Sequence, residues 1–223
     1  MTLRKAWNAL LDLIAPKDLT CELCGSERDI VPDTGLCSKC LNDLEQDIIV
    51  KRVYRQVMAY APLVHTGAAS HLVYGLKFGG RGYDAYVLSH FMKKAVGNRV
   101  SEDVILIPVP QHWTRYLRRG FNPAKYLADE LSKRLDCHVV SALKKLRRTA
   151  HQTGLDGAAR QENLRNAFAV KEPSLVQGKH VLLVDDVLTT GATCRACTIP
   201  LLLAGAASVI CVTATCSSAN IQK

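Results

Sequence analysis

Two aspartates and three threonines lie within one short segment, in an order that suits a sugar phosphate. The apolar residues 181–184 are followed by Asp185 and Asp186, and then by small and hydroxyl-bearing residues. The apolar run predicts a buried parallel strand, and α/β proteins bind ligands at the carboxyl ends of such strands. A helix that begins after the segment adds free N–H groups and a positive dipole end for a phosphate. We predict that the two carboxylates accept hydrogen bonds from ribose hydroxyls, and that the 5-phosphate is bound by Thr189, Thr190, Gly191, Ala192 and Thr193.

Two other interpretations apply to the same segment. An apolar strand that ends in two aspartates is also typical of the Walker B strand of an ATPase. That class of protein needs a Gly-x-x-x-x-Gly-Lys-Ser/Thr loop, which the sequence lacks, and the glycine-rich residues 75–82 have a different spacing. The aspartates would also suit a simple helix cap, but three threonines around one glycine exceed what a cap requires. A sugar phosphate is the favoured ligand.

Four cysteines form two Cys-x-x-Cys pairs near the start of the sequence. Cys21 and Cys24 are followed, after twelve intervening residues, by Cys37 and Cys40. Two such turns supply four thiolates, the ligand set of a structural zinc site with no place for a catalytic water. The total of nine cysteines is odd, which argues against a complete disulfide framework. A pair of redox-active dithiols is the alternative, but neither pair lies in a thioredoxin-like context.

Length and charge limit the classes of protein to consider. The 223 residues allow one α/β domain with a small appendage. The net charge of +9 favours anionic partners such as nucleic acid or phosphorylated metabolites, although a solvated basic surface would account for it too. No run approaches the roughly 20 apolar residues that span a bilayer, and residues 3–14 indicate a short amphipathic helix rather than a signal peptide. We therefore expect a cytoplasmic protein with no membrane insertion.

Short apolar runs alternate with amphipathic segments from about residue 55 onward. This alternation predicts βαβ units, and so an α/β fold with a mostly parallel sheet flanked by helices. We divide the chain into a small N-terminal module, residues 1–50, and an α/β domain, residues 51–223. Pro123 follows Asn122, a residue type that caps helices well, so a helix is expected to begin there. The expected strands are 56–65, 104–109, 181–184 and 207–213, and the expected helices are 68–76, 83–95, 123–135 and 192–204.

Residues 146–168 carry polar and basic side chains without an apolar period. A segment this long between the elements of a compact domain is usually functional or disordered. Since such loops often close over active sites, we favour a mobile active-site loop over plain disorder.

Two sets of motifs resemble known families. The segment from Asp185 to Thr193 resembles the phosphoribosyl diphosphate (PRPP) signature of type I phosphoribosyltransferases. Ile-Pro-Val-Pro at 107–110, Arg-Arg-Gly-Phe-Asn at 118–122 and the ordered residues of 146–168, together with the paired cysteines, are similar to the ComF family of competence proteins. This resemblance covers most of the chain. It implies a type I phosphoribosyltransferase-like fold with a small N-terminal zinc-binding module.

The resemblance also implies roles for further residues. In the loop after Pro110, Arg115 and Arg119, with their neighbour Arg118, would meet the diphosphate oxygens of PRPP. A flexible loop would close over PRPP and shield an oxocarbenium-like transition state from water, and magnesium would bridge the diphosphate and the ribose hydroxyls. Pro123 departs from the family, which more often has glutamine there. The catalytic residues predicted in the flexible loop are Arg148, Gln152 and Arg160.

The resemblance implies a PRPP-binding protein that acts in natural transformation and handles imported single-stranded DNA, with other DNA-uptake proteins as partners. One alternative is a metabolic phosphoribosyltransferase, which needs a base-recognising hood that a small zinc module does not supply. The other alternative is a PRPP-sensing regulator without catalysis. Both alternatives stay open from the sequence.

Overall fold

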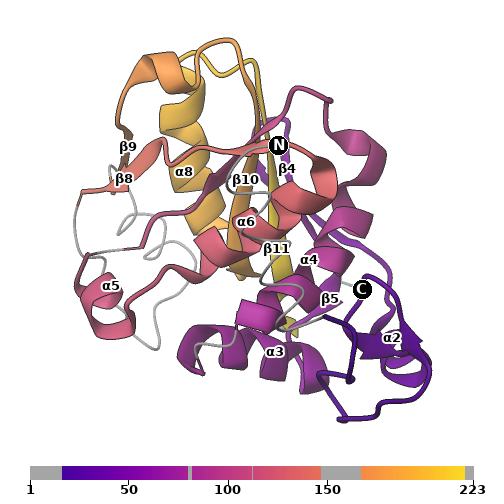
Figure 1. The fold of residues 1–223 in the computed structure, drawn as a ribbon. Helices are drawn as coiled ribbons and strands as arrows, with labels where there is room; N and C mark the ends of the chain where they lie inside the picture. Colours follow the sequence, from indigo (N-terminus) through magenta and orange to yellow (C-terminus); the bar gives the residue numbers. More distant parts are fainter. Residues whose placement is uncertain (1–16, 80–81, 112, 147–166, 219–223) are drawn as a thin grey trace, which may run out of the picture. The chain divides into compact units, whose positions relative to one another are not determined.

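The computed structural model describes residues 17–79, 82–111, 113–146 and 167–218 (Figure 1). The chain divides into two compact units, Met1–Glu45 and Gln46–Lys223, where the sequence analysis places the division after residue 50. The predicted N-terminal helix at 3–14 lies outside the described residues. Of the helices that the structure describes, none combines the length and the apolar character needed to cross a bilayer.

The first unit consists of a two-stranded ribbon and one helix. Its elements are β1 (Ile30–Val31), β2 (Leu36–Cys37), which pairs antiparallel with β1, and α2 (Ser38–Leu44). The Asp18 carboxylate fixes the turn between the strands, since it accepts hydrogen bonds from the N–H groups of Asp33 (2.9 Å) and Gly35 (2.7 Å). Besides cysteines, the large buried apolar side chains described in this unit are Leu36 and Leu44. Small domains with a core as limited as the described part of this one are usually stabilised by a cross-link such as a metal ion.

The second unit is built on a mostly parallel sheet. Its strands are β3 (Ile49–Tyr54), β4 (Val57–Ala61), β5 (Leu63–Val64), β6 (Ile105–Pro108), β7 (His138–Val139), β10 (His180–Leu188) and β11 (Ser208–Cys216). They lie in the order β3-β4-β11-β10-β6-β7, and β5 also pairs with β11. Only the edge pair β3 and β4 is antiparallel among these strands. The predicted fold class is therefore confirmed, and the two-sided burial of the central strands explains their continuous apolar runs.

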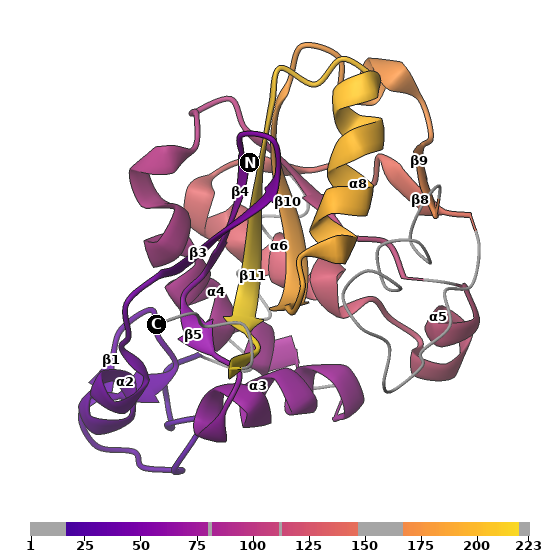
Figure 2. The same ribbon diagram turned by 180° about the vertical axis from the view of Figure 1, so that it is seen from behind.

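Helices cover both faces of this sheet (Figures 1 and 2). One face is covered by α8 (Ala192–Leu203), and the other by α4 (Gly82–Val96) and α6 (Pro123–Leu135). α3 (Gly67–Phe78) packs against α4 and contacts β11. α6 has the predicted bounds, and the Asn122 side chain caps it by accepting a hydrogen bond from the Ala124 N–H (3.2 Å).

Shorter elements complete the described part of the second unit. β8 (Leu143–Lys145) and β9 (Phe168–Val170) pair antiparallel and flank residues 147–166, which lie outside the described residues. The Leu146 N–H donates to the Ala167 carbonyl (2.8 Å), so the two ends of the predicted flexible loop are held together. The remaining elements are α5 (Trp113–Arg119) and two 3-10 turns, Gly97–Arg99 and Pro173–Leu175.

Candidate functional site

The two aspartates lie within β10 and not after it. The sequence predicted a strand that ends at Val184, but β10 continues to Leu188, because β11 is equally long and pairs with it over that length. On its other side β10 pairs with β6 only as far as Val184. In the described part of the chain, the edge of β10 that carries Asp185 and Asp186 thus extends past the end of β6. The predicted phosphate loop shortens to the turn 189–191.

A cavity of about 780 Å³ lies at this edge of the sheet. α3 forms one wall, and the residues between β6 and α6 form another. The volume falls in the range of pockets that bind small molecules. Thr190, Gly191 and Ala192 lie in the turn and at the start of α8 and are not among the residues that line the cavity. The predicted PRPP-binding residues that line the cavity are Asp185, Asp186, Thr189, Thr193 and Arg119.

The two carboxylates have different surroundings. Asp186 forms an ion pair with Lys77 of α3, with 3.0 Å between Oδ2 and Nζ. Burial, followed by the charge of Asp186, raises the pKa of Asp185 to about 7. The Asp186 N–H, which donates to Asp185 Oδ1 (2.9 Å), and the Lys77 charge only partly offset this rise. A ligand that brings hydroxyl donors or a cation would favour the ionised carboxylate.

The raised pKa of Asp185 predicts a pH-dependent stability. This carboxyl binds its proton more tightly in the folded chain than its usual pKa of 3.8 implies. Its contribution is therefore fully present below about pH 4 and is lost as the pH rises through 7. Asp185→Asn is neutral at every pH, so its Tm relative to wild type is expected to rise by roughly 5–10 °C between pH 5 and pH 8. Thermal unfolding followed by circular dichroism without ligand measures this difference.

Asp129→Asn is the control for this titration, because Asp129 lies on the surface of α6 in an i,i+4 pair with Lys125 (2.7 Å). Both variants lose one carboxylate, so the difference between their changes of Tm with pH reports the effect of the buried surroundings of Asp185. Parallel pH curves for wild type and Asp185→Asn would contradict the prediction.

The turn after β10 has a backbone shape that requires glycine. Gly191 has a φ of 81°, in the left-handed region, and is the N-cap of α8. A Cβ at this position would lie 2.9 Å from Val53 Cγ1 of β3. Lys51, on the same strand, donates from Nζ to the Thr189 carbonyl (3.2 Å). The edge hairpin thus supports the turn through one close contact and one hydrogen bond.

Three residues at the site were missed from sequence. Lys77 pairs with Asp186, Lys51 reaches Thr189, and His65 lines the cavity with its Nδ1 3.0 Å from Thr215 Oγ1. Burial, and then the charge of Lys77, lowers the pKa of His65. The contact of Lys51 with Thr189 spans 138 positions in sequence, which no local pattern can show. The one local signal is that Lys77 lies within the glycine-rich stretch 75–82.

The predicted diphosphate loop after Pro110 contains a helix, which corrects the sequence prediction. Residues 113–119 are all helix-compatible, and Gly120, with a φ of 77°, ends the helix as a left-handed cap. The Arg119 guanidinium carbon lies 4.7 Å from the centre of the Phe78 ring of α3. The side chains of the other two arginines lie outside the described residues. The predicted diphosphate ligands all belong to α5: Arg115, Arg118 and Arg119.

The residues predicted for catalysis lie outside the described residues: Arg148, Gln152 and Arg160. The strands that flank them are informative nevertheless. Lys145 at the end of β8 and Phe168 at the start of β9 both line the cavity, and the Lys145 Nζ lies 5.1 Å from the centre of the Phe168 ring. The segment 147–166 therefore leaves and rejoins the described structure at the cavity.

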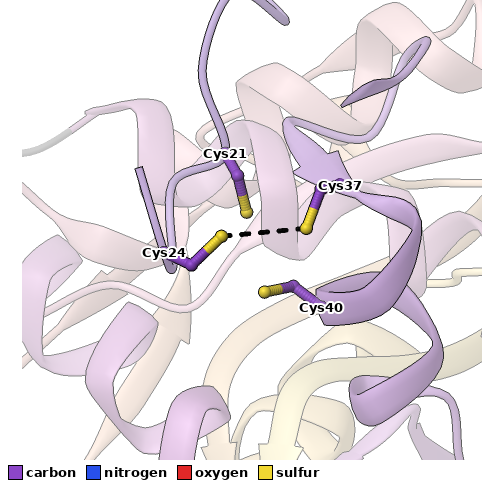
Figure 3. Close-up of side chains that lie close together, drawn as sticks. All are labelled: Cys21, Cys24, Cys37 and Cys40. Atoms are coloured by element: carbon purple, nitrogen blue, oxygen red, sulfur yellow. Dashed lines mark hydrogen bonds between the residues drawn. The ribbon is translucent and has the colours of Figure 1, made fainter. Parts of the chain in front are cut away.

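In the first unit, the side chains of all four predicted cysteines converge (Figure 3). Their sulfur atoms lie within 4.8 Å of one another, and the Cys24 and Cys37 sulfurs are 3.7 Å apart. Four thiolates around one zinc ion stand about 3.8 Å apart, given a Zn–S bond of about 2.3 Å. Although burial opposes it, backbone N–H groups of Cys37, Cys24 and Leu23 lower the pKa of Cys21 to about 7. The donor set and its spacing fit a tetrahedral metal site built from Cys21, Cys24, Cys37 and Cys40.

This chain is similar in sequence to several known proteins. A family model for the phosphoribosyl transferase domain matches residues 117–220. The DNA utilization protein YhgH of Shigella flexneri is 33% identical over 211 residues, which cover 85% of this chain and 86% of that protein. The YhgH protein of Escherichia coli (strain K12) is 32% identical with the same coverage. Competence protein F of Haemophilus influenzae is 40% identical over 90 residues, which cover 40% of this chain and 39% of that protein.

Among solved structures, the glutamine phosphoribosylpyrophosphate amidotransferase from B. subtilis aligns with a TM-score of 0.41 at 19% identity. The alignment covers 63% of this chain and 30% of that one. The sequence relatives and the domain match confirm the resemblance noted from the motifs. This chain belongs to the ComF family, with a phosphoribosyltransferase-like domain and an N-terminal four-cysteine cluster.

Proposed function

We propose that this protein binds PRPP with magnesium in the cavity at the end of β10, and acts in the handling of imported single-stranded DNA during natural transformation. One observation carries the proposal. Asp185 and Asp186 line the same cavity as Thr189 and Thr193, in a chain whose full-length relatives are DNA utilization proteins. The net charge of +9 suits a nucleic acid partner. Such a role places the protein in the cytoplasm.

Each part of PRPP has a chemical counterpart in the cavity. The carboxylates of Asp185 and Asp186 suit the ribose hydroxyls, and the residues from Thr189 to Thr193, at the start of α8, suit the 5-phosphate. The diphosphate is the proposed ligand of Arg115 and Arg119 on α5. Magnesium, when bound, neutralises diphosphate charge and keeps most of its water shell.

Lys77 forms an ion pair with Oδ2 of Asp186. Ribose hydroxyls that bind Asp186 would compete for the same oxygen, and Lys77 would then be released toward the phosphates. The segment with Arg148, Gln152 and Arg160 follows β8, which ends at Lys145, and precedes β9, which begins at Phe168; we propose that it closes over the ligand.

The four-cysteine cluster is the proposed site of one structural zinc ion. Four thiolates complete its coordination, which leaves no open position for catalysis. Other proteins of DNA uptake are proposed as further partners of the chain.

The test is calorimetric titration of PRPP with magnesium. The double variant Asp185→Asn/Asp186→Asn removes two charged acceptors, each worth about 1.5–3 kcal/mol to a hydroxyl donor, so PRPP affinity is expected to fall about 100-fold or more. Asp129→Asn/Glu130→Gln, on α6 and outside the lining of the cavity, is the matched control with the same change of charge and is expected to bind as wild type does.

The same titration separates the proposal from its alternatives. Failure of the wild type to bind PRPP with magnesium would refute the central claim. Turnover of PRPP with a common purine or pyrimidine would establish a metabolic phosphoribosyltransferase instead. Loss of transformation in Asp185→Asn, with unchanged affinity for single-stranded DNA, would support a role in transformation that depends on the PRPP site.

A further inference from the structure

An exposed aromatic pair lies on α3 at the cavity. Tyr74 and Phe78 are 61% and 55% exposed, and both line the cavity together with Asp185 and Asp186. Their ring centroids are 4.8 Å apart, with the planes tilted by 38°. Two adjacent rings that remain this open to water offer apolar area that a ligand can cover.

Helix geometry places this pair beside the carboxylates. Tyr74 lies three positions before Lys77 and four before Phe78, so it neighbours both side chains on the surface of α3. The Lys77 ammonium reaches Asp186 at 3.0 Å. Side chains three or four positions apart lie about 5–6 Å apart at Cβ. The two rings are therefore within one helix turn of Lys77, which contacts Asp186 of β10.

Cationic groups accompany the rings. The Arg119 guanidinium lies over Phe78 at 4.7 Å, and Lys77 and Lys145 line the same cavity. Among the described lining residues, the carboxylates are those of Asp185 and Asp186, which belong to β10. Aromatic faces combined with nearby cations are the means by which proteins bind single strands of nucleic acid, the rings stacking on bases and the cations meeting phosphates.

We propose that Tyr74 and Phe78 form a shelf on which an unpaired nucleobase of single-stranded DNA stacks, next to the sugar-phosphate site. This inference rests on the proposed function and names the part of the DNA that the cavity receives. Both residues are more than half exposed, so a strand whose base stacks on this pair can continue into solvent on either side. A base that arrived as a free molecule would need an enclosing pocket for comparable affinity.

The test compares two fluorescent strands of equal length, oligo(dT) and an abasic strand with the same number of phosphates, by anisotropy at one salt concentration. Wild type is expected to prefer oligo(dT) by about tenfold or more, the amount that one base–aromatic stack supplies. The variant Tyr74→Leu/Phe78→Leu keeps apolar side chains but no ring, and is expected to bind both strands equally. Its affinity for the abasic strand should stay within about twofold of wild type, since the phosphate contacts remain.

Two further variants guard against a folding artefact. Tyr74→Trp/Phe78→Trp keeps stacking surfaces and is expected to retain the preference for oligo(dT). Leu203→Ala removes an apolar side chain that is 83% exposed on α8 and is expected to leave the preference unchanged. Melting temperatures of all variants confirm that they are folded.

Several results would overturn the inference. If wild type bound both strands equally, Tyr74 and Phe78 would not stack on a base, even if PRPP still bound and the proposed function stood. A preference that survives in Tyr74→Leu/Phe78→Leu would place base recognition elsewhere. If free thymidine displaced the labelled strand as strongly as unlabelled oligo(dT) does, the ligand of the two rings would be a free nucleoside and not a DNA strand. A base preference that persists in a protein unable to bind PRPP would instead refute the proposed PRPP function and support the shelf.

Discussion

Replacing Gly191 by alanine is expected to lower the Tm by roughly 5–15 °C and PRPP affinity at least tenfold. Two costs add at this position. A non-glycine residue at a φ of 81° is strained, by about 1–2 kcal/mol. The new Cβ would also lie 2.9 Å from Val53 Cγ1, and overpacking of this kind costs about 1–3 kcal/mol. Both costs are relieved by moving the turn that we propose for the 5-phosphate. Thermal unfolding and calorimetric PRPP titration measure the two effects.

Gly178→Ala is the matched control for this prediction. Gly178 has a similar φ, 70°, but a Cβ there would meet nothing within 4 Å. It is therefore expected to show the backbone strain alone, and no change in PRPP affinity. Adding Val53→Ala to Gly191→Ala should recover the part of the stability that the close contact costs. Equal losses of Tm and PRPP affinity in Gly191→Ala and Gly178→Ala would contradict the proposed role of the turn.

Replacing Cys40 by serine is expected to abolish zinc binding and unfold the first unit. The described core of that unit holds few large apolar side chains, so we expect the proposed zinc ion to supply most of its stability. In small zinc-dependent domains, metal binding supplies about 10–16 kcal/mol of folding free energy. Metal analysis by mass spectrometry should find one zinc ion per wild-type chain and none in the variant. Hydrogen exchange over residues 17–45 should become fast, as it should in wild type treated with a strong chelator.

Cys137→Ser is the control for the cluster, because Cys137 lies before β7 in the second unit and outside the four-cysteine group. It should retain zinc and the slow exchange of the first unit. The second unit has its own extensive core, so in Cys40→Ser its melting temperature should change by less than about 2 °C. Unchanged zinc content in Cys40→Ser would show that the cluster is not the metal site.

The long central elements of the fold were predictable because their signals are local. Residues 181–184 and 104–109 are apolar because they are buried on both faces of the sheet, and the structure has strands at both places. The helix at Pro123–Leu135 is confirmed to the residue, since an N-cap asparagine and a following proline mark its start. A left-handed residue at Asp136 then ends it.

The elements that were missed are short or lie at edges. β3 has three exposed or half-exposed polar side chains among its six residues, Lys51, Arg52 and Tyr54, so it lacks the apolar run of a central strand. β8 and β9 have three residues each and depend on pairing with each other across the segment 147–166. α5 was missed because the family resemblance implied a diphosphate-binding loop after Pro110, whereas helix propensity decided its backbone.

The sequence by itself determined the four-cysteine cluster and the strand, turn and helix that carry Asp185, Asp186 and Gly191. Both features depend on the spacing of residues close together in the chain. Only the tertiary structure decided how far β10 extends, since the length of its partner β11 sets it. It also decided which distant side chains meet the site. Lys77, Lys51 and the Tyr74–Phe78 pair come from elements far away in sequence, and the burial that raises the pKa of Asp185 exists only once the chain has folded. Contacts of this kind depend on how elements pack, so no local pattern encodes them.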